Sequence, residues 1–257
     1  MIANEERKPV MISVIIPARN EEEFLPATLE ALERQSYRNF EVIVVANGCK
    51  DRTVEVAREH GCRVFDLESR GLGAARNLGG REAAGQILLF LDADTLLERN
   101  ALKHIAVRFR RSHACGTLLG QPDSQRLSHK LIYAVKNLIH ATHLHCGSSG
   151  VILCWKDHFM EVGGFDERLY LRENSHLMKR LRQFGRYRFL GKVAAVTSMR
   201  RYESQGTLEM VRLWLSVWWR SLVSDIRNET YEDLEKQSEE RRYARSARLR
   251  RTQAIGS

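Results

Sequence analysis

The stretch GLGAARNLGGREAAGQILLFLDAD, from Gly71 to Asp94, decides the fold. It contains a glycine-bearing turn, a helix-forming segment with Arg76 and Asn77, an apolar run from Ile87 to Leu91, and two aspartates separated by one alanine. A continuous apolar run is typical of a strand that is buried on both faces of a parallel sheet. We therefore predict a helix, then a buried strand, and then two carboxylates at the carboxyl end of that strand.

Asp92 and Asp94 occupy positions where a ligand is expected. Side chains two positions apart on a strand point to the same side, and open α/β sheets bind ligands at the carboxyl ends of their strands. Two carboxylates on one side repel each other unless a cation neutralises them. The pair therefore favours a hard divalent ion that holds a substrate diphosphate. A solvated turn at the strand end is the simpler alternative.

Strand-like and helix-like segments alternate on both sides of this stretch. Before it we expect strands over 11–16, 40–46 and 62–66, a helix from 20 or 21 to 35, and a helix to 60 that Asp51 caps. After it we expect helices over 99–111, 124–144, 156–162, 174–183 and 207–227, strands over 114–120 and 150–155, and at least one strand within 187–197. This alternation predicts an α/β fold with a doubly wound, mostly parallel sheet and helices on both faces.

The positive charge of the chain is concentrated near its C-terminus. The 257 residues are 43% hydrophobic, which is enough for a core, and the formal net charge is +9. Seven Lys and Arg residues lie between Lys236 and Arg251 with only Glu239 and Glu240 among them, so this tail carries +5. The remaining body is only mildly basic, which argues against nucleic acid as a partner. The tail suits anionic lipid or solvent.

Cysteine usage and the termini bear on the compartment. The five cysteines are odd in number and form no CxxC pair, so a reducing compartment is expected. The first residues, MIANEERKPVM, lack the apolar core of a signal peptide, and no run of about 18 apolar residues occurs. We therefore expect a cytoplasmic protein without a transmembrane helix, with peripheral contact at the inner face of a membrane as a further option.

Five motifs occur in a fixed order: VIIPARNEE, VVANGCKD, GLGAARNLG, FLDAD and VGGFDERLYLREN. Together they resemble the family 2 glycosyltransferases of the GT-A fold, and the resemblance extends over residues 11–202 and includes VTSMRRYESQG. It implies an inverting, hexosyltransferase-type enzyme that is assisted by Mg²⁺ or Mn²⁺. The implied donor is a nucleotide-sugar, with a UDP-sugar favoured. The implied acceptor is a hydroxyl of a saccharide, a lipid-linked molecule or a small molecule.

The resemblance also implies which residues bind the donor. The first loop would line the base and ribose, Asn47 stands where the family usually has a base-contacting aspartate, and Arg76 would help to hold the nucleotide. Asp92 and Asp94 would form the DxD pair, with Asp94 facing the metal and Asp92 facing the metal or the ribose. Independently of the resemblance, Arg200 and Arg201 follow a strand end and would reach the diphosphate; the simpler alternative is that both are surface arginines. The predicted donor residues are Pro17, Ala18, Arg19, Glu21, Asn47, Arg76, Asp92, Asp94 and Arg201.

The catalytic base is where the sequence departs from its family. The usual Glu-Asp pair appears as Glu173 and Asn174, and an asparagine cannot accept a proton. Either Glu173 is the base, or the acceptor chemistry differs, or the protein binds donor and transfers poorly. In that last alternative it docks on a membrane or a partner through its C-terminal helix and tail. A plainer alternative is that both residues only cap the following helix.

Two other kinds of nucleotide site are disfavoured by the sequence, and the sequence also suggests domain limits. A dinucleotide fingerprint is disfavoured because Arg76 replaces its third glycine, and a nucleotidyltransferase would need a loop rich in glycine and lysine where PARNEE stands. We expect a GT-A domain over 11–205, preceded by an N-terminal extension over 1–10. An amphipathic Trp-rich helix over 206–233 and a basic tail over 234–257 would follow. That helix would pack on the body, in a homo-oligomer or on a membrane.

Overall fold

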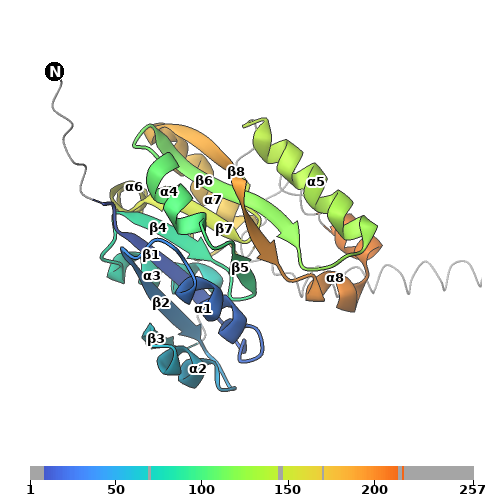
Figure 1. Ribbon diagram of the computed structural model, residues 1–257, viewed down its shortest axis with the longest axis horizontal. Coiled ribbons are helices and arrows are strands. Elements are labelled where there is room, and N and C mark those ends of the chain that lie inside the picture. Colours follow the sequence, from blue (N-terminus) through green and yellow to red (C-terminus); the bar gives the residue numbers. More distant parts are fainter. Residues whose placement is uncertain (1–8, 69–70, 144–146, 170, 214–215, 217–257) are drawn as a thin grey trace, which may run out of the picture.

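A single mixed sheet runs through the part of the chain described by the computed structural model, which is residues 9–68, 71–143, 147–169, 171–213 and 216 (Figure 1). Within these residues the strand order is β3-β2-β1-β4-β7-β6-β8-β5. The strands are β1 (Ile12–Ala18), β2 (Phe40–Asn47), β3 (Arg63–Leu67), β4 (Ile87–Leu91), β5 (Thr95–Leu97), β6 (His113–Pro122), β7 (Val151–Trp155) and β8 (Arg186–Thr197).

Most of the sheet is parallel, as predicted. Strands β3, β2, β1 and β4 pair in parallel, and so do β6 and β8. Strand β7 lies antiparallel between β4 and β6. The short strand β5 pairs antiparallel with β8 at one edge. The carboxyl ends of β1, β2 and β4 therefore lie side by side, which is where ligands of α/β sheets bind.

Helices cover both faces of this sheet, which confirms the predicted α/β class. One face packs α1 (Leu25–Glu33), α2 (Thr53–Glu59) and α4 (Ala101–Arg108), and the other packs α3 (Leu72–Glu82), α6 (Lys156–Glu161) and α7 (Glu173–Leu181). Successive residues of β4 alternate between these two cores, with Leu89 in the first and Leu88 in the second. The apolar run in the sequence is continuous because both faces of β4 are covered.

The remaining helices lie beside β6 and β8. They are α5 (Leu127–Ala141) and α8 (Arg200–Gln205), and a short 3₁₀ helix, η1 (Arg182–Phe184), follows α7. Tyr133 of α5 and Tyr202 of α8 share a small apolar cluster with Met199 and Met210. This cluster fixes the C-terminal end of the described chain against α5 (Figure 1).

The structure differs from the sequence prediction at several places, which include helix α8, for which no helix was predicted. The first helix begins at Leu25 rather than at 20 or 21, because Asn20 has a left-handed φ of 55° and Pro26 occupies the first turn. Asp51 does not cap α2 directly, since the N-cap residue is Arg52. Strand β5 was not predicted, because three residues are too few to show an alternating pattern.

The predicted C-terminal helix is only partly described. Residues 207–213 are helical, whereas Trp214, Trp218, Trp219 and the tail over 234–257 lie outside the described residues. Residues 1–8 of the predicted N-terminal extension also lie outside them. Among the described helices, none has the length and apolar character needed to span a bilayer.

Candidate functional site

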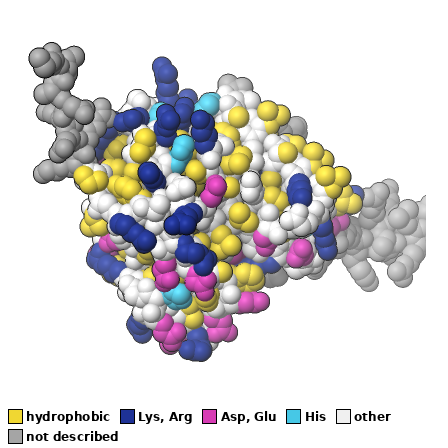
Figure 2. Space-filling model, in the orientation of Figure 1, with side chains coloured by type: hydrophobic (Ala, Val, Ile, Leu, Met, Phe, Trp, Pro, Cys, Tyr) yellow, Lys and Arg dark blue, Asp and Glu magenta, His cyan; other side chains and the backbone are white. Residues whose placement is uncertain are grey.

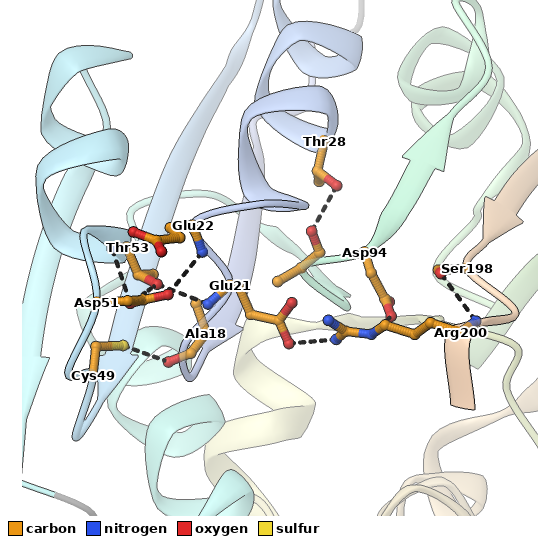
Figure 3. Close-up of polar contacts among 11 residues, drawn as sticks. Ala18, Glu21, Glu22, Thr28, Cys49, Asp51, Thr53, Asp94, Ser198 and Arg200 are labelled. Atoms are coloured by element: carbon orange, nitrogen blue, oxygen red, sulfur yellow. Dashed lines mark hydrogen bonds and ion pairs between the residues drawn. The ribbon is translucent and has the colours of Figure 1, made fainter. Parts of the chain in front are cut away.

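The loops that follow β1 and β2 are tied together by hydrogen bonds (Figure 3). The backbone N–H of Glu21 donates to Thr53 Oγ1 at 2.8 Å, and the backbone N–H of Glu22 donates to Asp51 Oδ2 at 3.0 Å. Asp51 Oδ1 accepts from the backbone N–H and the hydroxyl of Thr53. Burial raises the pKa of Asp51, but these hydrogen bonds outweigh it, so the pKa lies below its usual value. The sequence motifs PARNEE and NGCKD thus form one rigid unit.

The predicted donor residues in these loops differ in their exposure. Pro17 and Ala18 are buried at the end of β1, and Asn47 is buried at the end of β2. Cys49 donates a weak hydrogen bond to the carbonyl oxygen of Ala18. Arg19 is exposed. Pro17, Ala18 and Asn47 therefore lie beneath the surface at the carboxyl edge of the sheet, whereas Arg19 is exposed to solvent.

Arg200 connects the first loop to the DxD pair. Its Nη2 donates to Glu21 Oε1 at 2.6 Å, and its Nε lies 3.3 Å from Asp94 Oδ2 (Figure 3). The guanidinium carbon also lies 4.2 Å from the centre of the Phe24 ring. Arg201, which the sequence placed in the donor site, is exposed on α8. Arg200, and not Arg201, therefore bridges Glu21 and Asp94.

The pairing of β5 with β8 explains how Arg200 reaches this position. Thr95 of β5 lies opposite Thr197 of β8, and the backbone N–H of Ser198 donates to the carbonyl oxygen of Asp94 at 3.1 Å. The backbone N–H of Met199 then donates to Asp123 Oδ1 at 2.9 Å. These contacts turn the chain so that α8 begins directly beside Asp94.

The negative charges of the carboxylates at this edge are only partly neutralised by neighbouring cations and hydrogen-bond donors. Burial raises the pKa of Asp94 to about 6, and the charges of Asp92 and Glu21 add to the increase while Arg200 opposes it. Among the described residues, the buried Oε2 of Glu21 has no hydrogen-bond partner. An acceptor that is buried without a donor is costly. This edge therefore has the electrostatic character of a cation site.

Arg76 is the centre of a second polar cluster. Its Nη2 donates to Asp92 Oδ1 at 3.0 Å, and its Nη1 donates to Glu173 Oε1 at 3.0 Å and to Asn174 Oδ1 at 2.8 Å. The side chain is only 3% exposed. A guanidinium group with several fixed donors can satisfy three acceptors at once. The arginine of the GLGAARNLG motif thus joins the DxD pair to the Glu173-Asn174 pair.

The glycines of α3 allow Arg76 to reach this depth. A Cβ atom at Gly79 would overlap with the side chain of Ile15 on β1, and a Cβ atom at Gly80 would overlap with the ring of Phe159. Helix α3 therefore packs directly on the sheet. The glycine-rich sequence serves close helix–sheet packing, which is a different role from the phosphate-binding turn of a dinucleotide fingerprint.

Glu173 and Asn174 are held inside the protein at the start of α7. Glu173 is 8% exposed, and burial raises the pKa of its carboxyl group against the opposing effect of Arg76. Asn174 Nδ2 donates to Ser148 Oγ at 3.2 Å. Neither side chain caps α7, whose N-cap residue is Arg172. The helix-capping alternative therefore does not explain this pair.

The DxD residues fit a divalent ion that is completed by substrate oxygens. No group of three or more His, Cys, Asp or Glu residues in the described chain is arranged to hold a metal by itself. Mg²⁺ is usually held by one or two carboxylates together with substrate phosphates. Asp94 is 17% exposed and Asp92 is 40% exposed at their side chains, so both remain within reach of a ligand at the edge.

A protein-family model matches the amino-terminal part of the chain. The model for glycosyl transferase family 2 matches residues 13–163, which is more than half of the chain. The chain belongs to this family.

Curated relatives match parts of the chain. It is similar to 4,4'-diaponeurosporenoate glycosyltransferase of Staphylococcus haemolyticus, with 40% identity over 119 residues that cover 43% of this chain and 32% of that protein. It is also similar to dolichyl-phosphate beta-glucosyltransferase of Drosophila melanogaster, with 42% identity over 106 residues that cover 35% of this chain and 32% of that protein. The match thus spans about a third of each relative's length.

Solved structures show the GT-A fold. S. aureus TarS 1–349 in complex with UDP-GlcNAc has a TM-score of 0.61 and 21% identity, covering 73% of this chain and 58% of that chain. The mannosyltransferase PcManGT from Pyrobaculum calidifontis, in complex with GDP-Man and Mn²⁺, has a TM-score of 0.62 and 20% identity, covering 74% and 57%. At these identities the likeness concerns the fold.

Proposed function

We propose that this protein transfers a sugar from a nucleotide-sugar donor to a hydroxyl acceptor, with inversion at the anomeric carbon. The observation that carries the proposal is the cluster of Glu21, Asp92 and Asp94 at the carboxyl edge of the sheet. Its negative charge exceeds what Arg200 and Arg76 neutralise, so it suits a cation together with a diphosphate. The family to which the chain belongs supports the same reaction.

The donor would lie across the loops that follow β1, β2 and β4. The unit made by the first two loops would hold the base and ribose, with Arg19 and Glu21 at its rim. A UDP-sugar is the first donor to test, although the two similar structures hold UDP-GlcNAc and GDP-Man, respectively. Mn²⁺ is present in the second of these structures, which supports Mg²⁺ or Mn²⁺ as the cofactor here.

The charge of the leaving diphosphate would be neutralised from two directions. Asp94 and Asp92 would hold the divalent ion, which when bound offsets negative charge on the leaving group. The guanidinium of Arg200 would turn from Glu21 and Asp94 toward the phosphate oxygens, which suit its fork of donors. Arg201, which the sequence predicted for this contact, stays a prediction.

Glu173 is the proposed base for the acceptor hydroxyl. Burial raises the pKa of its carboxyl group, which strengthens a carboxylate as a proton acceptor. Its Oε1 is bound by Arg76, so the proton would go to Oε2. Asn174 would orient the site through Ser148 and Arg76. The acceptor would lie near Ser148 and the GGFDE segment, and its chemical class is a saccharide, a lipid-linked molecule or a small molecule.

A second candidate function is that of a sugar-nucleotide-binding protein with weak transfer. Two observations favour it: Asn174 replaces the usual aspartate, and Glu173 is enclosed by the protein. The two candidates share donor binding and differ in turnover. This second candidate would also need a membrane or partner on which to dock through the C-terminal helix and tail.

Turnover of a donor panel tests the two candidates. UDP-, GDP- and dTDP-sugars are incubated with the full chain in Mn²⁺, in Mg²⁺ and in EDTA, and nucleotide release and binding are both measured. The first proposal expects metal-dependent release with at least one donor, and the second expects binding without release. Asp94→Ala should abolish metal-dependent donor binding, whereas Asp157→Ala, an exposed aspartate on α6, should not. Absence of binding to every donor would overturn both candidates.

A further inference from the structure

Helix α5 presents an apolar face to solvent. Leu127 is 81% exposed, Leu131 is 62% exposed and Leu138 is 69% exposed, and these residues follow one another at helical spacing. The polar residue His129 and the aromatic residue Tyr133 are instead buried against the body. The most apolar face of α5 therefore points to solvent, whereas most amphipathic helices bury that face. We call this face the apolar stripe; it consists of Leu127, Leu131, Val135, Leu138 and Ile139.

Helix α5 carries basic residues and no acidic residue, and the exposed acids Asp123 and Glu203 lie before α5 and on α8. No aspartate or glutamate occurs between Ser124 and Lys156. Arg126 and Lys130 are exposed at the amino-terminal end of α5. Helix α5 itself contains no acidic residue, which is unusual for a helix with a solvated face, where both signs are normally interspersed.

A basic patch continues this surface at the carboxyl-terminal end of α5. The patch consists of Arg110, which precedes β6, His113 at the start of β6, and Arg186 and Arg188 at the start of β8. His113 lies opposite Arg186 in the sheet, and its Nδ1 accepts from the backbone N–H of Arg110 at 3.0 Å. Burial, followed by the charges of Arg188, Arg110 and Arg186, lowers the pKa of His113. His143, just beyond α5, contacts the ring of Tyr187, with 5.9 Å between ring centres; Tyr187 lies between Arg186 and Arg188 in sequence and points to the other side of β8 from them. Among the described residues, the buried Nε of Arg188 has no hydrogen-bond partner.

Both features lie on one face of the molecule. Figure 2 shows Lys, Arg and His side chains gathered at the top of the view, over the start of β8, and hydrophobic side chains along the upper right, over α5. An apolar helix face with a cationic border is the pattern of a helix that lies in the interface of a membrane. Anionic headgroups attract Lys and Arg near the surface, and apolar side chains enter the boundary below them.

We propose that the apolar stripe and the basic patch form a docking surface for an anionic lipid bilayer. A second copy of the chain fits less well, because a symmetric contact through this face would bring cationic borders together without an acid between Ser124 and Lys156 to pair with them. The strongly basic segment from Lys236 to Arg251 would likewise be repelled by the patch. The inference does not depend on which sugar the protein transfers.

Vesicle binding by the full chain tests this surface. Cosedimentation is measured with phosphatidylcholine vesicles and with vesicles that also contain phosphatidylglycerol, at low and high salt. The wild type should bind the anionic vesicles and lose affinity in high salt. Leu131→Gln/Leu138→Gln should weaken binding at least tenfold. Arg110→Gln/Arg186→Gln should weaken it about fivefold per residue and reduce the salt dependence. Met160→Gln, which changes an exposed apolar residue on α6, is the matched control and should bind like the wild type.

Each alternative occupant gives a different result. Equal binding by the wild type and the Leu131→Gln/Leu138→Gln variant overturns the proposal, because the basic tail alone would then explain it. A dimer that this variant dissociates, without vesicle binding, assigns the surface to a second copy. A fall in the Tm of this variant with unchanged vesicle binding shows that the chain's own C-terminal segment covers the stripe. Either of these outcomes also overturns the proposal.

Discussion

Arg76 and Asp92 are joined by a hydrogen bond of 3.0 Å between the guanidinium Nη2 and the carboxylate Oδ1. The same guanidinium group binds Glu173 through its other terminal nitrogen. The first aspartate of the DxD pair and the proposed base are therefore positioned by a single buried arginine. A change in the position of Arg76 would therefore alter the positions of both Asp92 and Glu173.

Removal of Arg76 should destabilise the fold chiefly through Glu173. Arg76→Ala leaves a buried carboxylate without its partner, and we expect a loss of about 3–5 kcal/mol in the free energy of unfolding. Glu173→Gln in the same background should restore part of the loss, because a neutral amide is cheaper to bury. Urea unfolding of the two single variants and the double variant measures the coupling. Strict additivity of the two losses would show that the pair does not interact.

The raised pKa of Asp94 predicts a specific dependence of stability on pH. Its folded pKa of about 6 lies above the usual value, so between the two values the folded state binds more protons than the unfolded state. Asp94 therefore favours folding at low pH, and this contribution is lost as the pH rises from about 4 to about 6. Asp94→Asn should gain of order 2 kcal/mol relative to the wild type above pH 6 and little below pH 4.

The comparison is made by urea unfolding between about pH 3.5 and about pH 7.5, a range that includes the expected window. Other carboxylates titrate in the same range, so the difference between the variant and the wild type is the informative quantity. A difference that stays constant with pH would mean that Asp94 is not protonated more readily in the folded state.

Arg200 and Arg201 provide a matched pair on one helix. Arg200→Ala removes the bridge to Glu21 and Asp94, and we expect donor affinity to fall about tenfold or more, as for the loss of a charge-assisted hydrogen bond. Arg201→Ala should change it by less than about twofold, since an exposed surface charge contributes little. Isothermal titration with a nucleotide-sugar and Mn²⁺ measures both variants. The opposite ranking would restore Arg201 to the donor site.

Gly79 and Gly73 of α3 should respond in opposite directions to alanine. At Gly79 the new methyl group would overlap with Ile15 on the sheet, and overpacking of this kind costs about 1–3 kcal/mol. At Gly73 the nearest atom is the Cα of Glu167 at 3.4 Å, which is an ordinary contact. Gly73→Ala should therefore be neutral or stabilise by about 0.5–1 kcal/mol. Thermal unfolding of both variants checks the order, and equal effects would contradict the packing role of Gly79.

The features that are local in the sequence were the ones that could be predicted. The apolar run of β4 and the alternation of strands and helices led to the correct fold class, because burial on both faces leaves a pattern within a few residues. The five motifs led to the correct family. Strand β5 could not be predicted, since its three residues are a strand only because β8 lies beside them.

The contacts within the site depend on residues that are distant in the chain. Nothing in VTSMRRYESQG distinguishes Arg200 from Arg201, and the choice follows from the hydrogen bond between Ser198 and Asp94. The role of Arg76 in holding the nucleotide stays a prediction, and its contacts with Asp92, Glu173 and Asn174 leave no pattern in the sequence. The periodicity of α5 showed an amphipathic helix but did not show which face would point to solvent.

The bridge between Glu21 and Arg200 joins residues 179 positions apart. During synthesis the first loop and the DxD pair leave the ribosome long before Arg200 does, so the edge of the sheet cannot be closed until α8 has folded against it. A chain interrupted before that point would retain the excess negative charge at this edge without its counter-charge. Contacts of such long range form slowly because a large loop must close first. The contacts of Arg200 with Glu21 and Asp94 are therefore among the last of the site to form.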